Sequence, residues 1–98
     1  MDITEAQEAG RAVAILDGRL DTATAPMTEA KLTALLKQGG VIADLSAVRY
    51  VSSAGLRVLL KAAKLAKEGG VPFAVVGLQA PVREVFEISG FDKIIPAF

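Results

Sequence analysis

Residues 41–68 read VIADLSAVRYVSSAGLRVLLKAAKLAKE and contain the clearest strand and helix patterns of the chain. Its first part, Val41–Leu45, is a short apolar run of the kind that forms a fully buried strand. Its last part, Ala54–Glu68, places apolar residues at helical spacing and stops before the glycine pair Gly69-Gly70, which predicts a long helix. Ser52-Ser53 stands directly before that helix. The stretch therefore predicts a buried strand, a connecting loop and a helix that begins with two hydroxyl groups.

The predicted helix has three faces when its residues are spaced 100° apart. The face expected in the core holds Leu56, Leu59, Leu60 and Ala63. The face expected in solvent holds Arg57, Lys61, Lys64 and Glu68. A smaller apolar stripe, made of Val58, Ala62 and Leu65, either packs on a neighbouring helix or stays partly exposed as a docking surface. From Leu45 to Lys67 there are five basic residues and no acid, so this region is either an ordinary solvated face or a guide for an acidic partner.

Strand and helix patterns alternate outward from this stretch. Strands are predicted at Ile3–Gln7, Arg11–Leu16 and Val71–Gly77, with a last edge strand at Ile94-Ile95, and helices at Thr24–Lys37 and Ala80–Ser89. This alternation predicts a single α/β domain over residues 1–98 with parallel central strands. The expected core residues are Val13, Ile15, Leu35, Ile42, Leu45, Leu56, Leu59, Leu60, Val75 and Phe86.

Composition excludes several classes of protein. Eleven basic and eleven acidic residues among 98 give a net charge of zero, which argues against a nucleic-acid binder. The chain has no cysteine and no histidine, so we expect no metal site, no cofactor and no enzymatic activity. The acidic N-terminal residues are unlike a signal peptide, and no apolar run has the length of a membrane span. We therefore expect a cytoplasmic protein that does not insert into membranes.

The two serines before the long helix have two readings. In one, a serine oxygen caps the helix by accepting a hydrogen bond from a free backbone N–H. In the other, the helix N-terminus supports a phosphorylated serine, because its free N–H groups and its dipole favour anions. Gly55 lacks a Cβ, which leaves room for another group to approach. Spacing alone does not separate these readings.

The segment VIADLSAVRYVSSAGLRVLL closely resembles the anti-sigma factor antagonists, the small members of the STAS domain family. LDGRLDTATAP resembles the turn before the first helix of that family, and VREVFEISGFDKIIP resembles its last helix and the segment that follows. The resemblance thus covers nearly the whole chain in order. It implies a single STAS-like domain, with a central sheet of mixed direction and helices mostly on one face.

The resemblance also implies a partner and a switch. In this family the unphosphorylated antagonist captures an anti-sigma factor that is a serine kinase, and so frees a sigma factor for transcription. Phosphorylation of one serine ends the capture, and a serine phosphatase is a further expected partner. The family's phosphoacceptor position corresponds to Ser53, while Ser52 replaces the family's aspartate and is an alternative acceptor. Ala54 stands where the family has a second hydroxyl residue.

The resemblance assigns roles to two acids, and together with the helix faces described above it completes the expected binding surface. Asp21 corresponds to an acid near the phosphosite and Asp44 to the acid at the end of the preceding strand, although both also suit ordinary turn and cap roles. The expected partner-binding residues are Asp21, Ser52, Ser53, Gly55, Arg57, Val58 and Lys61.

Two other functions stay open. The chain could be a stand-alone STAS subunit of a membrane lipid-transport complex, in which Ser53 would be unused. A small nucleotide- or ligand-binding domain is the weakest alternative, because the sequence has no glycine-rich phosphate loop and no aromatic platform for a base.

Overall fold

A computed structural model describes the whole chain, from Met1 to Phe98. Its elements, in chain order, are β1 (Asp2–Glu8), β2 (Arg11–Leu20), α1 (Ala25–Leu36), β3 (Val41–Val51), α2 (Ser53–Gly69), β4 (Phe73–Val76), α3 (Ala80–Ile88) and a short 3-10 turn, η1 (Phe91–Lys93). The predicted order of strands and helices is confirmed as far as α3. The strands β2 and β3 run further than expected: β2 continues to Leu20, which four residues separate from α1, and β3 continues to Val51, which one residue separates from α2.

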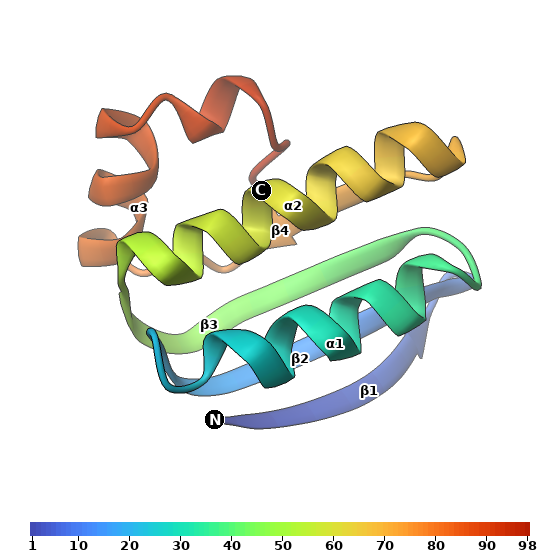
Figure 1. Ribbon diagram of the computed structural model, residues 1–98, viewed down its shortest axis with the longest axis horizontal. Helices are drawn as coiled ribbons and strands as arrows, with labels where there is room; N and C mark the ends of the chain where they lie inside the picture. Colours follow the sequence, from blue (N-terminus) through green and yellow to red (C-terminus); the bar gives the residue numbers. More distant parts are fainter.

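The strands form one sheet in the order β1-β2-β3-β4. β1 and β2 are antiparallel, whereas β2, β3 and β4 are parallel to one another. The turn between β1 and β2 places Ala9 and Gly10 at φ of 53° and 78°, as in the two-residue turns that match the twist of a hairpin. Figure 1 shows α1 and α2 lying side by side over the same face of this sheet. The predicted mixed sheet with helices mostly on one face is confirmed.

The register of the sheet explains which strand residues are buried. Ala14, Ala43 and Val75 are neighbours across the three parallel strands, and all three are fully buried on the face that α1 and α2 cover. Ile15 and Ile42 alternate with them and therefore point to the other face. Both are only partly buried, so their assignment to the core was wrong: no helix of the chain covers that face as α1 and α2 cover the first.

The buried side of α2 also differs from the predicted one. Its buried residues are Gly55, Val58, Leu59, Ala62 and Ala66. Of the residues expected in the core, only Leu59 is fully buried, whereas Leu56, Leu60 and Ala63 are partly exposed. The reason is that α2 packs against α1 as well as on the sheet, which turns the stripe containing Val58 and Ala62 inward. The alternative in which that stripe packs on a neighbouring helix is thus confirmed for these two residues.

The end of the chain departs from the prediction in a third way. Ile94-Ile95 does not form an edge strand, because η1 precedes it and Ile95 is fully buried in the core. The pairing lies further on: the Phe98 N–H donates to the Val75 carbonyl at 2.9 Å, and Val75 and Ala97 form a parallel bridge. The rings of Phe86 and Phe91 meet edge to face, with centroids 5.9 Å apart, and hold this segment against α3. None of the helices has the length and apolar character needed to cross a membrane.

Truncation of two adjacent leucines in α2 tests this packing. Leu59→Ala should lower the free energy of unfolding by about 2–5 kcal/mol, because it opens a cavity in a fully buried site. Leu60→Ala should cost about 1 kcal/mol or less, because that side chain is partly exposed. Urea denaturation of both variants measures the difference, and equal losses would contradict the orientation of α2.

Candidate functional site

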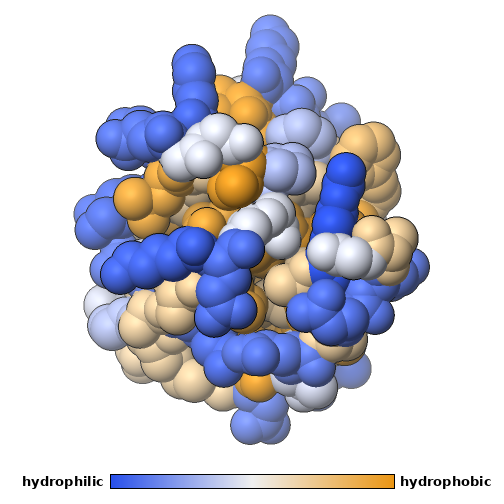
Figure 2. All heavy atoms as spheres, turned by 90° about the vertical axis from the view of Figure 1, so that its right-hand side faces the viewer, coloured by the Kyte–Doolittle hydropathy of each residue, from blue (hydrophilic) through white to orange (hydrophobic).

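The candidate site lies at the end of the sheet where the parallel strands finish. Because β2, β3 and β4 are parallel, the helices that follow them, α1, α2 and α3, all begin at this end, on the left of Figure 1. The opposite end is shown in Figure 2, where hydrophilic side chains divide the apolar surface into small areas. The end with the helix N-termini therefore gathers the free backbone N–H groups from the first turns of three helices.

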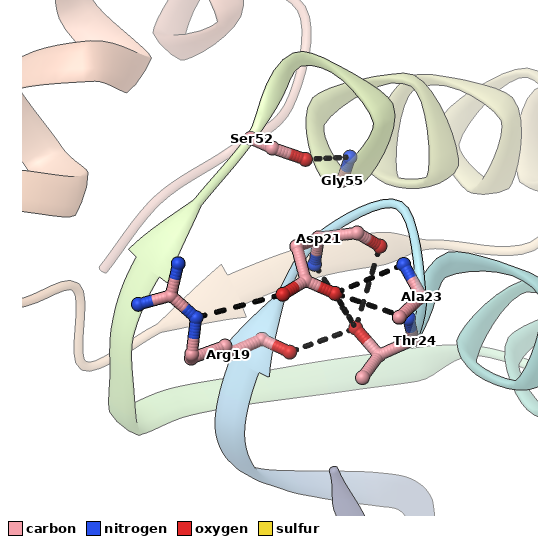
Figure 3. A network of polar contacts seen from close by, with 6 residues as sticks. All are labelled: Arg19, Asp21, Ala23, Thr24, Ser52 and Gly55. Carbon is pink, nitrogen blue, oxygen red and sulfur yellow. Dashed lines mark hydrogen bonds and ion pairs between the residues drawn. The ribbon is translucent and has the colours of Figure 1, made fainter.

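The two serines occupy different positions at the start of α2. Ser52 is extended, with φ −85° and ψ 174°, and its Oγ accepts a hydrogen bond from the Gly55 N–H at 3.2 Å (Figure 3). Its own N–H donates to the Leu20 carbonyl at 2.9 Å, which joins the start of α2 to the end of β2. Ser53 is the first helical residue and is exposed. The capping role thus belongs to Ser52, and the Ser53 hydroxyl stays available to other molecules.

Gly55 is needed for packing within the chain. A Cβ at this position would lie 2.6 Å from the Leu20 carbonyl oxygen and 2.8 Å from Leu20 Cγ. The space that the sequence predicted beside Gly55 is therefore filled by the end of β2, and Gly55 itself is buried. The prediction that this space admits an outside group was wrong. A glycine stands here because α2 approaches the backbone of β2 too closely for any side chain.

Asp21 closes the turn between β2 and α1. Its Oδ1 accepts hydrogen bonds from the N–H groups of Ala23 at 3.0 Å and Thr24 at 3.2 Å. The Thr24 hydroxyl accepts from the Asp21 N–H at 2.9 Å and donates to the Arg19 carbonyl at 2.7 Å. The N–H of Thr24 foremost, and then that of Ala23, holds the pKa of the Asp21 carboxyl below its usual range. Figure 3 shows this turn beside the start of α2, so the carboxylate shapes the rim of the site.

Thr24 was not singled out from the sequence. An aspartate followed three residues later by a threonine, just before a helix with proline in its first turn, is the signal that could have found it. Asp44, in contrast, lies in the middle of β3 rather than at its end. It accepts from the Ser46 N–H at 2.9 Å and from the Ser46 hydroxyl at 2.7 Å, which is a local turn role.

The predicted binding residues on α2 divide into rim and floor. Arg57 and Lys61 are exposed, and Lys61 Nζ pairs with Glu29 Oε1 of α1 at 3.1 Å. Arg57 has no acidic partner in the chain. Val58 is only 6% exposed and forms the floor of a shallow groove of about 370 Å³ between the two helices. The chain shows no cluster of acidic residues that could hold a metal ion.

Comparisons with known proteins agree with this geometry. A family profile described as the STAS domain matches residues 4–98. BtrV of Bordetella bronchiseptica, which is named as an anti-sigma factor antagonist, is 41% identical over 98 residues, covering 98% of this chain and 84% of that protein. The structure of an anti-sigma factor antagonist from Mycobacterium paratuberculosis has a TM-score of 0.89 and 26% identity, covering 99% of this chain and 84% of that one.

A third similar protein is SpoIIAA of Bacillus, an anti-sigma factor antagonist solved in two forms. Its unphosphorylated form has a TM-score of 0.81 and 18% identity, covering 99% of this chain and 88% of that one. Its phosphorylated form has a TM-score of 0.74 and 17% identity, covering 99% and 91%. At these identities the likeness is one of fold.

A pair of glycine substitutions in α2 tests the contact at the start of the helix. Gly55→Ala should lower the free energy of unfolding by about 1–3 kcal/mol, because the added methyl group overlaps the backbone of β2. Gly69→Ala is the matched control, since a Cβ there meets nothing within 4 Å, and it should be neutral or stabilising by up to about 1 kcal/mol. Thermal and urea unfolding of both variants gives the comparison. A Gly55→Ala variant as stable as the control would contradict the close approach.

Proposed function

Because the chain belongs to the STAS domain family, we propose that it is an anti-sigma factor antagonist that captures an anti-sigma factor with serine kinase activity. In this proposal capture frees a sigma factor, and phosphorylation of Ser53 ends the capture. A serine phosphatase would restore the binding form. The name of BtrV, 41% identical over 98 residues, supports the first part. The proposal places the protein in the cytoplasm and needs no catalytic group in this chain, since the partner performs the phosphoryl transfer.

The proposed switch is supported by the different roles of the two serines. Ser52 uses its Oγ to cap α2, whereas the Ser53 hydroxyl is exposed and makes no hydrogen bond within the chain. A kinase must reach an exposed hydroxyl, so Ser53 is the better acceptor. A phosphate there would sit at the first residue of a long helix, where free N–H groups and the helix dipole stabilise an anion by about 0.3–1 kcal/mol. The fold should therefore accept the modification.

The change at the surface should be large. We define the docking surface as the exposed residues that follow the helix start on one side of α2: Ser53, Arg57, Lys61 and Lys64. Phosphorylation adds about −1.5 to −2 charges to a surface whose own charged side chains are cations, of which only Lys61 is paired with an acid, Glu29 of α1. Arg57 lies one helical turn beyond Ser53, within reach of the phosphate, and has no other acidic partner. The phosphate would thus cancel the nearest cation and would itself have to be desolvated at the interface, which is costly.

Phosphopeptide mapping tests the acceptor. We expect the anti-sigma factor that copurifies with this protein from its native cells, supplied with ATP, to label Ser53 in the wild type and in Ser52→Ala. Ser52→Ala should lose about 1 kcal/mol of stability with the helix cap and still be labelled. Ser53→Ala should bind the kinase and resist release, while Ser53→Asp should keep its melting temperature and lose binding.

The outcomes separate the remaining alternatives. Label on Ser52 alone would move the switch by one residue and contradict the assignment to Ser53. Absence of label on both serines, with a kinase preparation that is active on another substrate, would refute the switch. It would favour the alternative in which the chain is a subunit of a transport complex.

A second prediction concerns the cations of the docking surface. Replacing Arg57, Lys61 and Lys64 together by glutamine should slow association with the anti-sigma factor and flatten its dependence on salt, because the local electrostatic steering by this surface is lost. Folding should hardly change, since exposed charges contribute little to stability. Arg83→Gln on α3 is the control for loss of an exposed arginine elsewhere. Unchanged association rates at low salt would show that these residues form an ordinary solvated face and do not guide the partner.

A further inference from the structure

A cavity separate from the docking surface opens beside the ends of β2 and β3. It has a volume of about 860 Å³, within the range of about 300–1,000 Å³ of small-molecule sites. Its polar lining comes from three parts of the chain and includes Asp17, Arg19, Ser46, Arg49, Tyr50 and Gln79. A single inorganic ion would leave most of this volume empty. The size and the lining therefore suit a small polar organic molecule.

The backbone of β3 is irregular along this cavity. Between Asp44 and Ala47, β3 has one residue more than the paired part of β2, and between Val48 and Tyr50 the same happens again. Ser46 lies in the first irregularity and Arg49 in the second. Such bulges turn side chains out of the regular alternation of a strand and are common beside functional sites. Here both of them direct polar residues to one cavity.

The two arginines of the cavity differ in how they are held. The Arg19 guanidinium lies over the Tyr50 ring, 4.2 Å from its centroid, and its Nε is 3.5 Å from Asp21 Oδ2 (Figure 3). Because the turn fixes Asp21, Arg19 is positioned before any ligand arrives. Arg49 pairs with no acid of the chain and is exposed in the wall of the cavity. The cavity thus offers one guanidinium that is paired with an acid and stacked on a ring, and one whose charge is not balanced by an acidic partner.

The remaining polar groups of the cavity can accept hydrogen bonds from hydroxyl groups of a ligand. Gln79 donates its Nε2 to the Ser46 carbonyl at 2.6 Å, which leaves its amide oxygen free to accept. Asp17 forms no ion pair and offers a carboxylate. Apart from Ala47, Gly18 and the Tyr50 ring, every lining residue carries a charged or polar side chain that can bond to a polar ligand.

We propose that this cavity binds a small organic phosphate that carries hydroxyl groups. The phosphate lies between the guanidinium groups of Arg19 and Arg49, which match its oxygens by charge and by their planar arrangement of donors. Its hydroxyl groups donate to the Asp17 carboxylate and to the Gln79 amide oxygen. This site is distinct from Ser53 and does not depend on the phosphorylation switch.

Nuclear magnetic resonance on the labelled protein tests the proposal with glycerol 3-phosphate as the probe. We expect saturable shifts of the Arg19 and Arg49 side-chain N–H signals and of the Tyr50 backbone signal. Arg49→Gln should weaken binding at least tenfold and leave the rest of the spectrum unchanged. Arg83→Gln and Ser53→Ala should bind as the wild type does, which separates this site from the switch.

Two further additions complete the test. Glycerol, which has the hydroxyl groups without the phosphate, should cause no shift, and sodium sulfate at equal ionic strength should shift the arginine signals far less. Equal responses to sulfate and to glycerol 3-phosphate, shifts that do not saturate, or unchanged binding in Arg49→Gln would each overturn the proposal.

Discussion

The contact between the first turn of α2 and the end of β2 is the constraint on which the site depends. Leu20 contributes its carbonyl oxygen twice: it accepts the Ser52 N–H, and it occupies the space where a Cβ of residue 55 would be. The helix start is thereby fixed against the sheet. Because the same strand end leads directly into the turn closed by Asp21, the cap of α2 and the rim around it form one rigid unit.

The sequence predicted the order of elements because apolar runs and glycine stops are local signals. It could not predict which side of α2 faces inward, because Leu60 and Ala62 are both apolar and either could face the core. The packing of α1 against α2 determines that Ala62 is buried and Leu60 is partly exposed. Ile15 and Ile42 failed for a related reason: their hydrophobicity does not say that only one face of the sheet is covered by α1 and α2. Leu59 and Phe86 were predicted correctly, and both are almost completely buried.

At the site, the serine pair was predictable and its division of roles was not. Both serines suit the start of a helix, and only the backbone of Ser52, extended and bonded to Leu20, shows which one caps it. Gly55 was correctly singled out from the sequence, but for the wrong reason. The missing side chain makes room for Leu20 of β2 and not for an outside group. The stacking of Arg19 on Tyr50 joins residues on two different strands, and their spacing along the sequence does not predict this contact.

The parallel arrangement of β2, β3 and β4 has an electrical consequence. It aligns the starts of α1, α2 and α3 at one end of a molecule whose net charge is zero. Each helix start carries a partial positive charge, whereas a sheet contributes little dipole of its own. A neutral protein built in this way is not drawn toward a charged partner as a whole. It is rotated by the partner's field, so that electrostatics selects the orientation in which the two molecules first meet.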